Sequence, residues 1–208
     1  MAPPAPSLTS SPPATDRYTI CRAVRREDLA GARAVVLFAA EHDLGYGYQP
    51  EWHWDLDRMV ETYVDNPRQA MFVATDATGA VVATAAIRVG GPNVPPHPEE
   101  LGRRYADRQA VAQLLRVATL PEHRRARLAR RLVAACQEFV RDDGGFRVIY
   151  LHTNTRVPAA EPFWRSLPVV EIRDDRDEER DPRFATVHFE LPLETVISGR
   201  ADRHAVPD

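Results

Sequence analysis

The residues best suited to chemistry are the arginines that crowd a short stretch near the middle of the chain. Arg124, Arg125, Arg127, Arg130 and Arg131 lie at or just after the start of an expected helix. The first turn of a helix carries unpaired N–H groups and a partial positive charge, so cations are unfavourable there unless an anion binds. A phosphate would face the N–H groups, the helix dipole and the guanidinium groups together. We therefore predict a phosphate-bearing ligand at this turn. The alternative is a solvated face whose arginine stems cover the apolar side of the helix.

Two elements must position these arginines: a strand before them and a helix after them. The strand is an apolar run over residues 114–120, which Pro121 ends. A basic turn follows at residues 123–127, and apolar residues then recur at the three- and four-residue spacing of a helix that buries one side. The apolar residues at this spacing are Leu128, Leu132, Cys136, Phe139 and Val140.

This stretch resembles the acyl-CoA-binding core of the GNAT acyltransferases. In that family a strand ends in a hydrophobic-x-Pro step, and a loop of Arg or Gln, two residues, Gly, one residue, and Gly or Ala opens a long helix. Residues 117–121 match the strand end, and residues 124–129 match the loop. Arg127 stands where the family prefers Gly, a residue that lets the backbone approach a pyrophosphate closely. The backbone N–H of Arg127 can still donate if its φ is negative.

The resemblance implies that acetyl-CoA, or another acyl-CoA, binds as co-substrate, and that no metal is needed. An Asn before a later short helix contacts the cofactor in the family, and Asn154 fits that position. The residues expected to bind the cofactor are Val117, Ala118, Thr119, Arg124, Arg125, Ala126, Arg127, Leu128, Ala129, Arg130 and Asn154.

The implied reaction is direct attack of an amine on a thioester, with backbone N–H groups near Ala118 and Thr119 stabilising the charge on the carbonyl oxygen. The amine must be neutral, so a base or a water chain must take its proton. Many family members carry Glu on the central strand, whereas Gln113 and Arg116 are the polar side chains here. The candidate bases are Glu51, His53, Asp55 and His152. A water relay without a single essential base is the alternative.

The tyrosine that protonates the departing thiolate in many members aligns with Trp164. An indole N–H is a hydrogen-bond donor but not a usable acid at neutral pH. The assignment of the acid therefore does not carry over to this chain.

Aromatic residues concentrate in a loop-like segment at residues 45–54, which two glycines and a proline interrupt. The resemblance places the acyl acceptor beside this segment, so it is either the wall of a pocket or a lid packed on the core. The aromatic residues expected to bind the acceptor are Tyr46, Tyr48, Trp52 and Trp54. Residues 90–98 would border the same site and shape its specificity, unless they form only a surface loop.

The fold class expected from pattern and resemblance is α/β (α+β), with a mixed, mostly antiparallel central sheet flanked by helices. One domain would span residues 17–194, after a disordered leader rich in Pro and Ala at residues 1–16 and before a polar tail at residues 195–208. Strands are expected at residues 18–24, 69–75, 80–89, 109–120, 146–153, 169–172 and 184–191. Helices are expected at residues 26–43, 55–64, 99–107 and from residue 128, with a short one ending at residue 167.

Composition argues against several other classes of protein. The formal net charge of -3 gives no bulk attraction to nucleic acid or to an anionic membrane. The first residues lack the charged and apolar regions of a secretory signal, and no apolar run has transmembrane length. The histidines show no metal-ligand spacing. Cys21 and Cys136 fit small buried apolar residues in a reducing cytoplasm.

The sequence therefore predicts a cytoplasmic N-acyltransferase that transfers an acetyl group from acetyl-CoA to a small-molecule amine. It predicts no nucleic-acid or membrane partner, and it leaves a homodimer open. The alternative is a catalytically weak or inactive module of the same fold that binds CoA or regulates another protein.

Overall fold

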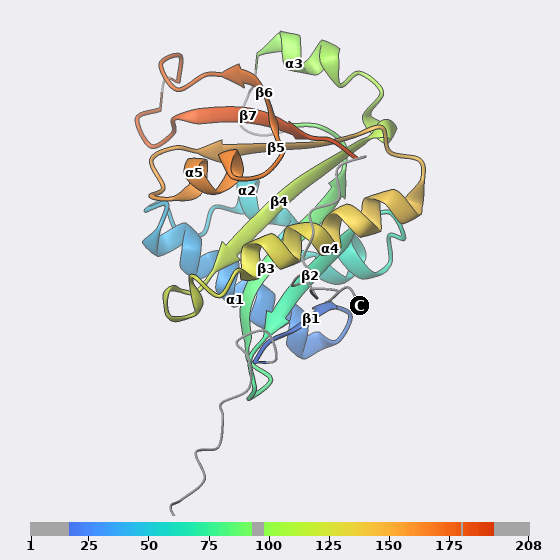
Figure 1. Cartoon of the computed structure of the whole chain (residues 1–208), viewed down its shortest axis with the longest axis vertical. Coiled ribbons are helices and arrows are strands. Elements are labelled where there is room, and N and C mark those ends of the chain that lie inside the picture. Colours follow the sequence, from blue (N-terminus) through green and yellow to red (C-terminus); the bar gives the residue numbers. More distant parts are fainter. Residues whose placement is uncertain (1–16, 93–97, 180, 194–208) are drawn as a thin grey trace, which may run out of the picture.

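The computed structural model describes residues 17–92, 98–179 and 181–193. The predicted leader and tail lie outside the described residues. The described part contains a seven-stranded sheet in the order β1-β2-β3-β4-β5-β7-β6 (Figure 1). In chain order the elements are β1 (Thr19–Arg22), α1 (Arg26–His42), α2 (Pro50–Asp57), the π-helix η1 (Val60–Val64), β2 (Ala70–Thr75), β3 (Val81–Val89), α3 (Glu99–Arg104), the 3-10 turn η2 (Arg108–Ala110), β4 (Val111–Thr119), the 3-10 turn η3 (Pro121–His123), α4 (Leu128–Asp143), β5 (Val148–Asn154), α5 (Ala160–Arg165), β6 (Val170–Asp174) and β7 (Thr186–Leu191).

The pairing of β4 with β5 distinguishes this sheet from a plain antiparallel one. All other neighbouring strands are antiparallel, whereas β4 and β5 run parallel. They pair only at their beginnings, where residues 111–113 lie beside residues 148–150. Further along, the two strands separate, as Figure 1 shows. The mixed, mostly antiparallel sheet is the one that the sequence predicted, and the separation opens a gap in its centre.

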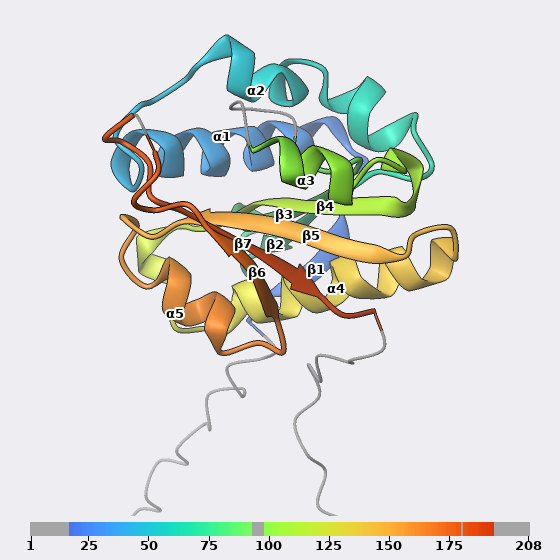
Figure 2. The same cartoon turned by 90° about the horizontal axis from the view of Figure 1, so that it is seen from above.

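Helices cover both faces of the sheet. Figure 2 shows α1, α2 and α3 on one face and α4 and α5 on the other. The apolar stripe of α4 packs against the sheet, with Leu128, Leu132 and Cys136 buried in the larger core. Cys21 is only half-buried, so the expectation of burial holds for Cys136 alone. Among the described residues, no helix is both long enough and apolar enough to span a membrane.

The segment at residues 45–54 differs from the prediction of an irregular loop. Helix α2 begins at Pro50 and ends at Asp57, with a kink at His53, whose φ and ψ are -116° and 16°. Proline is well tolerated in the first turn of a helix, because that turn does not use its N–H, so Pro50 starts this helix and does not interrupt it. The helix predicted over residues 55–64 is correspondingly divided between the end of α2 and the π-helix η1.

We predict that Leu132→Ala destabilises the protein by about 2–5 kcal/mol, because it leaves a cavity under the centre of α4. Leu132 is fully buried, whereas Glu138 on the same helix is exposed. The free energy of unfolding, measured by urea titration, should fall in L132A and stay nearly unchanged in the control E138A. Equal effects of the two substitutions would show that this stripe does not face the core.

Candidate active site

A cavity of about 1420 Å³ lies where β4 and β5 separate. Both strands contribute to its wall, through residues 114–119 of β4 and through Tyr150, His152, Thr153 and Asn154 of β5. The first turn of α4 lines it from one face of the sheet, and α1, α2 and the loop between β6 and β7 line it from the other. A ligand in this cavity can therefore contact both sides of the sheet through the gap.

The first turn of α4 has features that were predicted for an anion site. Arg127 precedes the helix with a φ of 57° and makes no side-chain cap to it. Arg125 is also left-handed, with a φ of 69°. The first N–H groups of α4 thus lack a side-chain cap, and residues 127–130 line the cavity. The negative φ considered for Arg127 is not observed: the loop keeps a conformation that favours glycine, with an arginine in it.

The arginines of this turn divide into two groups. Arg124 Nη2 donates to Asp43 Oδ2 at 2.6 Å, at the end of α1. Arg130 donates to Ser166 and Arg131 to the backbone of Tyr18, so these three arginines bind elements of the fold. Arg125 and Arg127 also line the cavity. Within the described residues their side chains have no hydrogen-bond or ion-pair partner, which leaves two guanidinium groups for an anionic ligand.

A bulge in β4 shapes the opposite wall of the gap. The pairing with β3 shifts between Thr84, which faces Ala118, and Ala86, which faces Leu115. Arg116 takes up the extra residue with a φ of 56°, and Thr84 Oγ1 donates to its carbonyl oxygen at 2.7 Å. The bulge bends the strand just before Ala118. The predicted oxyanion donors near Ala118 and Thr119 therefore lie directly after a local change in backbone direction.

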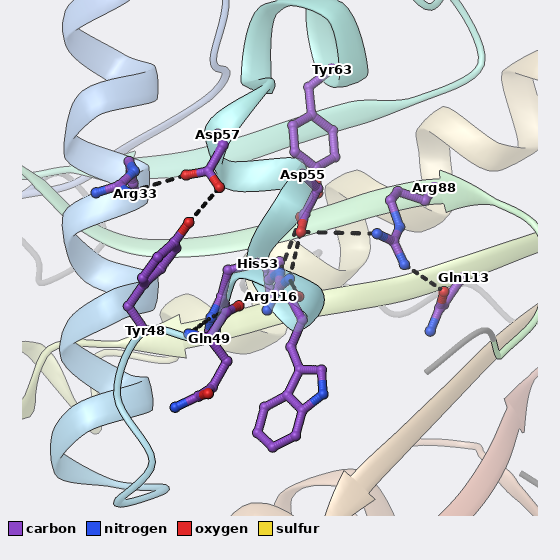
Figure 3. Close-up of polar contacts among 11 residues, drawn as sticks. Arg33, Tyr48, Gln49, His53, Asp55, Asp57, Tyr63, Arg88, Gln113 and Arg116 are labelled. Atoms are coloured by element: carbon purple, nitrogen blue, oxygen red, sulfur yellow. Dashed lines mark hydrogen bonds and ion pairs between the residues drawn. The ribbon is translucent and has the colours of Figure 1, made fainter. Parts of the chain in front are cut away.

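The side chain of Arg116 is held by a buried ion pair with Asp55 (Figure 3). Arg116 Nη2 lies 2.5 Å from Asp55 Oδ1 and also donates to the backbone oxygen of Trp52. Tyr63 donates its hydroxyl to Asp55 Oδ2 at 2.5 Å, and Arg88 Nη1 lies 3.9 Å from the same carboxylate. Asp55 is fully buried. The pair therefore fastens α2 to the bulge of β4.

Electrostatics keep this carboxylate charged. Burial alone would raise the pKa of Asp55, but the hydrogen bonds and positive charge of Arg116 more than offset it and lower the pKa below its usual range. Asp55 is thus occupied as a structural anion, which removes it from the candidate bases.

The sequence and the fold were compared with known proteins. A family model described as the acetyltransferase (GNAT) family matches residues 34–167. The chain belongs to the GNAT family of acetyltransferases. The comparison with curated proteins gave no match.

Solved GNAT structures share the fold. An acetyltransferase of the GNAT family from Staphylococcus aureus MU50 superposes with a TM-score of 0.65 at 12% identity, covering 85% of this chain and 99% of the other. The ribosomal-protein-S18-alanine N-acetyltransferase of Escherichia coli gives 0.57 at 17% identity, covering 91% and 99%. The spermidine/spermine N-acetyltransferase of Vibrio cholerae gives 0.56 at 16% identity, covering 87% and 95%. At these identities the likeness shows the fold.

All but one of the predicted cofactor residues of this GNAT protein line the cavity. Ala126 is half-buried against the core and is not part of the cavity wall. Asn154 lines the cavity, but its amide already donates to the backbone oxygen of Arg183 at 2.8 Å and its Oδ1 accepts from two backbone N–H groups. The remaining members line the cavity: Val117, Ala118, Thr119, Arg124, Arg125, Arg127, Leu128, Ala129 and Arg130.

The aromatic residues expected to bind the acceptor divide in two. Tyr46 and Trp52 line the cavity and meet edge to face at 5.0 Å. Tyr48 is exposed and donates to Asp57 Oδ2 at 2.6 Å, and Trp54 is exposed beneath Arg88. Trp52 and Trp54 lie on either side of a kink of α2 at His53, and Tyr46 and Tyr48 precede the helix.

The candidate bases occupy very different places. Glu51 is exposed and lies outside the cavity wall. His53 is buried in the wall, and its Nδ1 lies 2.9 Å from the backbone nitrogen of Gln49 and 3.1 Å from the backbone oxygen of the same residue. Burial, together with the charge of Arg116, lowers the pKa of His53 and keeps it neutral. His152 lines the cavity from β5.

Trp164 is buried in the core and reaches the cavity wall. Sequence reasoning missed Tyr150, His188 and Asp175, which also line the cavity. These residues belong to β5, β7 and the loop after β6, so only the strand register brings them together. The signal in the sequence is the alternation of Tyr150 and His152 on β5, together with His188 in the later strand β7. No group of three or more His, Cys, Asp or Glu side chains suited to a metal ion occurs in the described ranges.

We predict that Asp55→Asn destabilises the protein by about 3–5 kcal/mol, because it leaves the buried Arg116 without its counter-charge. A lowered folded-state pKa contributes stability above the unfolded value of about 3.9 and loses it as the pH falls through the folded value. Urea unfolding at a series of pH values should therefore show a weaker acid dependence in D55N. The exposed neighbour Asp57, changed to Asn, is the control and should behave nearly as wild type.

We also predict that Arg127→Gly stabilises the protein by about 1 kcal/mol. A left-handed conformation costs an L-residue roughly 1–2 kcal/mol that glycine does not incur, and the greater freedom of glycine in the unfolded chain cancels part of the gain. Arg130→Gly, inside the helix, should lose about 1 kcal/mol. Urea titration measures the free energy of unfolding of both variants. A destabilised R127G would contradict the left-handed conformation of Arg127.

Proposed function

We propose that this GNAT protein transfers the acetyl group of acetyl-CoA to the amine of a small molecule. The observation that supports this most directly is the joint position of the first turn of α4 and the gap between β4 and β5 on one cavity. An anion site at one end and an opening through the sheet at the other suit a long, phosphate-bearing donor whose reactive end must reach the far face.

The residues at the α4 turn fit the phosphate part of such a donor. Backbone N–H groups at a helix start and guanidinium groups are strong ligands for phosphate oxygens. Arg125 and Arg127 would supply the guanidinium groups, and residues 128–130 the N–H groups. When bound, acetyl-CoA supplies an activated thioester; Val117, Ala118 and Thr119 would lie beside it on β4.

The chain's own groups then have two tasks. Backbone N–H groups after the bulge, near Ala118 and Thr119, would stabilise negative charge on the carbonyl oxygen. A cavity group must hold the proton that the attacking amine loses. The buried pair of Asp55 and Arg116 contributes indirectly, by fixing the bulge from which those N–H groups project.

The wall on the far face suits a small cationic amine. Tyr46, Trp52 and Phe184 form an aromatic group there, with Trp52 and Phe184 meeting at 5.4 Å. Glu178 and Glu179, on the loop after β6, add carboxylates to the same wall. A protonated amine is attracted to carboxylates and to aromatic faces. Two structural relatives are named for acetylating spermidine or spermine and the alanine of a ribosomal protein, which supplies two chemically distinct acceptors to test.

We predict that acetyl-CoA binds and that free thiol is released in the presence of an amine. Calorimetry with CoA measures the first step. Thiol detection with spermidine, tyramine and an alanine-terminated peptide measures the second. Arg125→Gln should weaken CoA binding about tenfold or more, since a charge-assisted hydrogen bond is lost. Arg147→Gln is the control, because Arg147 pairs with Asp107 on the surface and lies outside the cavity wall.

The outcomes separate the proposal from its alternative. CoA binding without turnover of any amine would favour a module of the same fold that binds CoA without catalysis, for which the replacement of the family's tyrosine by Trp164 is the supporting observation. Absence of binding at millimolar CoA would contradict both.

A further inference from the structure

A continuous line of hydrogen bonds crosses the acceptor side of the cavity wall. His152 Nδ1 lies 3.1 Å from the hydroxyl of Tyr150. The same hydroxyl lies 2.7 Å from His188 Nδ1, and His188 Nε2 lies 3.1 Å from Asp175 Oδ2. His152 and His188 are direct partners in the pairing of β5 with β7. All four side chains line the cavity.

With both histidines neutral, the end of this line at Asp175 indicates where each proton lies. A carboxylate only accepts hydrogen bonds, so His188 carries its proton on Nε2. The Nδ1 of a neutral His188 is then an acceptor, and the hydroxyl of Tyr150 donates to it. The oxygen of Tyr150 is left to accept from His152, which therefore carries its proton on Nδ1. The basic lone pair of His152 is accordingly on Nε2.

The line lies on the face of the sheet opposite α4. Tyr150 packs against Leu101 and Tyr105 of the α3 region, with ring centroids of the two tyrosines 5.0 Å apart. Figure 2 places α3 with α1 and α2, and α4 on the other face. A thioester reaching through the gap from the α4 turn would meet these side chains on the side from which an acceptor attacks.

We propose that His152 is the catalytic base and that Tyr150, His188 and Asp175 position it. This inference rests on the proposed acyl transfer. The nitrogen lone pair of the neutral amine forms the C–N bond, the C–S bond breaks with its electrons going to sulfur, and His152 Nε2 takes the proton of the amine. That proton then passes to the thiolate or to water, so the products are the amide and the free thiol.

The line also gives the new charge a stable location. Once Nε2 is protonated, the Nδ1 proton of His152 can move to Tyr150 as the hydroxyl proton of Tyr150 moves to His188. The positive charge then rests on His188 beside the carboxylate of Asp175. His53 offers no such route, because its Nδ1 contacts the backbone of Gln49 and not a side chain that leads to a carboxylate.

Several charged groups surround this line. Arg173 Nε forms an ion pair with Asp175, and Glu178 pairs with Arg173 at 2.6 Å. Glu179 is held by the hydroxyl of Thr186. From α3 and β7, Tyr105 donates to Glu190, which also pairs with Arg104. Burial, followed by the neighbouring Tyr105 and Asp175, raises the pKa of Tyr150, so it remains a hydroxyl donor at neutral pH.

The first test needs no substrate. Long-range proton–nitrogen NMR spectra distinguish the two tautomers of each histidine, and the signals are assigned by their loss in His152→Gln and His188→Gln. We expect the proton on Nδ1 of His152 and on Nε2 of His188 near neutral pH. A proton on Nε2 of His152 would overturn the proposal, whatever the enzyme assay shows.

The second test is kinetic and uses spermidine, or whichever amine of the panel is turned over. H152Q should lower kcat by about a hundredfold or more, the usual contribution of a general base. It should also remove the loss of rate at acid pH that a histidine base causes when it becomes protonated. Tyr150→Phe should lower kcat and shift that limb, because it breaks the link to His188.

His42→Gln is the matched control: it removes an exposed histidine at the end of α1, outside the cavity wall, and should leave kcat and the pH profile unchanged. CoA affinity by calorimetry should be the same in all variants. A wild-type kcat and an unchanged acid limb of the pH profile in H152Q would contradict the role of His152 as the catalytic base. If the wild type binds CoA but turns over no amine, the proposed acyl transfer is wrong. The NMR spectra would still test the predicted tautomers of His152 and His188.

Discussion

The structure depends on one constraint: β4 and β5 are neighbours in the sheet, but their backbones pair only at the beginning of each strand. Backbone N–H and C=O groups in the middle of a sheet normally pair, and leaving them without partners inside a protein is costly. Where the strands separate, the cavity takes the place of the missing pairing, and polar side chains and helix ends gather at its wall. The proposed acyl-donor and acceptor sites are therefore two sides of a single interruption of the sheet.

The buried pair of Asp55 and Arg116 maintains the shape of that interruption. A left-handed arginine in a central strand is strained, and the ion pair holds it in place from a different element, α2. Buried ion pairs add little to net stability because both charges lose their water. Their effect is geometrical: Asp55 can be satisfied only when α2 and the bulge are in their correct relative positions. The pair thus defines the shape of the wall near Ala118.

Much of the fold could be predicted from the sequence, because its strongest signals are local. The apolar stripe of α4 and the strand before it have clear periodicity, and both form as expected. Helix α2 was missed because Pro50 was interpreted as a break, although the same residue is favourable at a helix start. Tyr48 and Trp54 lie outside the expected pocket because they contact other residues, Asp57 and Arg88 respectively.

The site was less predictable, since its parts are related by register and not by spacing. Tyr150, His188 and Asp175 have no shared motif, and they meet only because β5 pairs with β7 in one particular alignment. The left-handed backbone of Arg127 was equally hidden, because its residue type favours other conformations.

A cavity lined from both faces of the sheet also has a kinetic consequence. If the proposed acyl transfer holds, the two substrates would bind on opposite sides of the gap and react in a ternary complex, without a side chain that carries the acyl group between them in a ping-pong cycle.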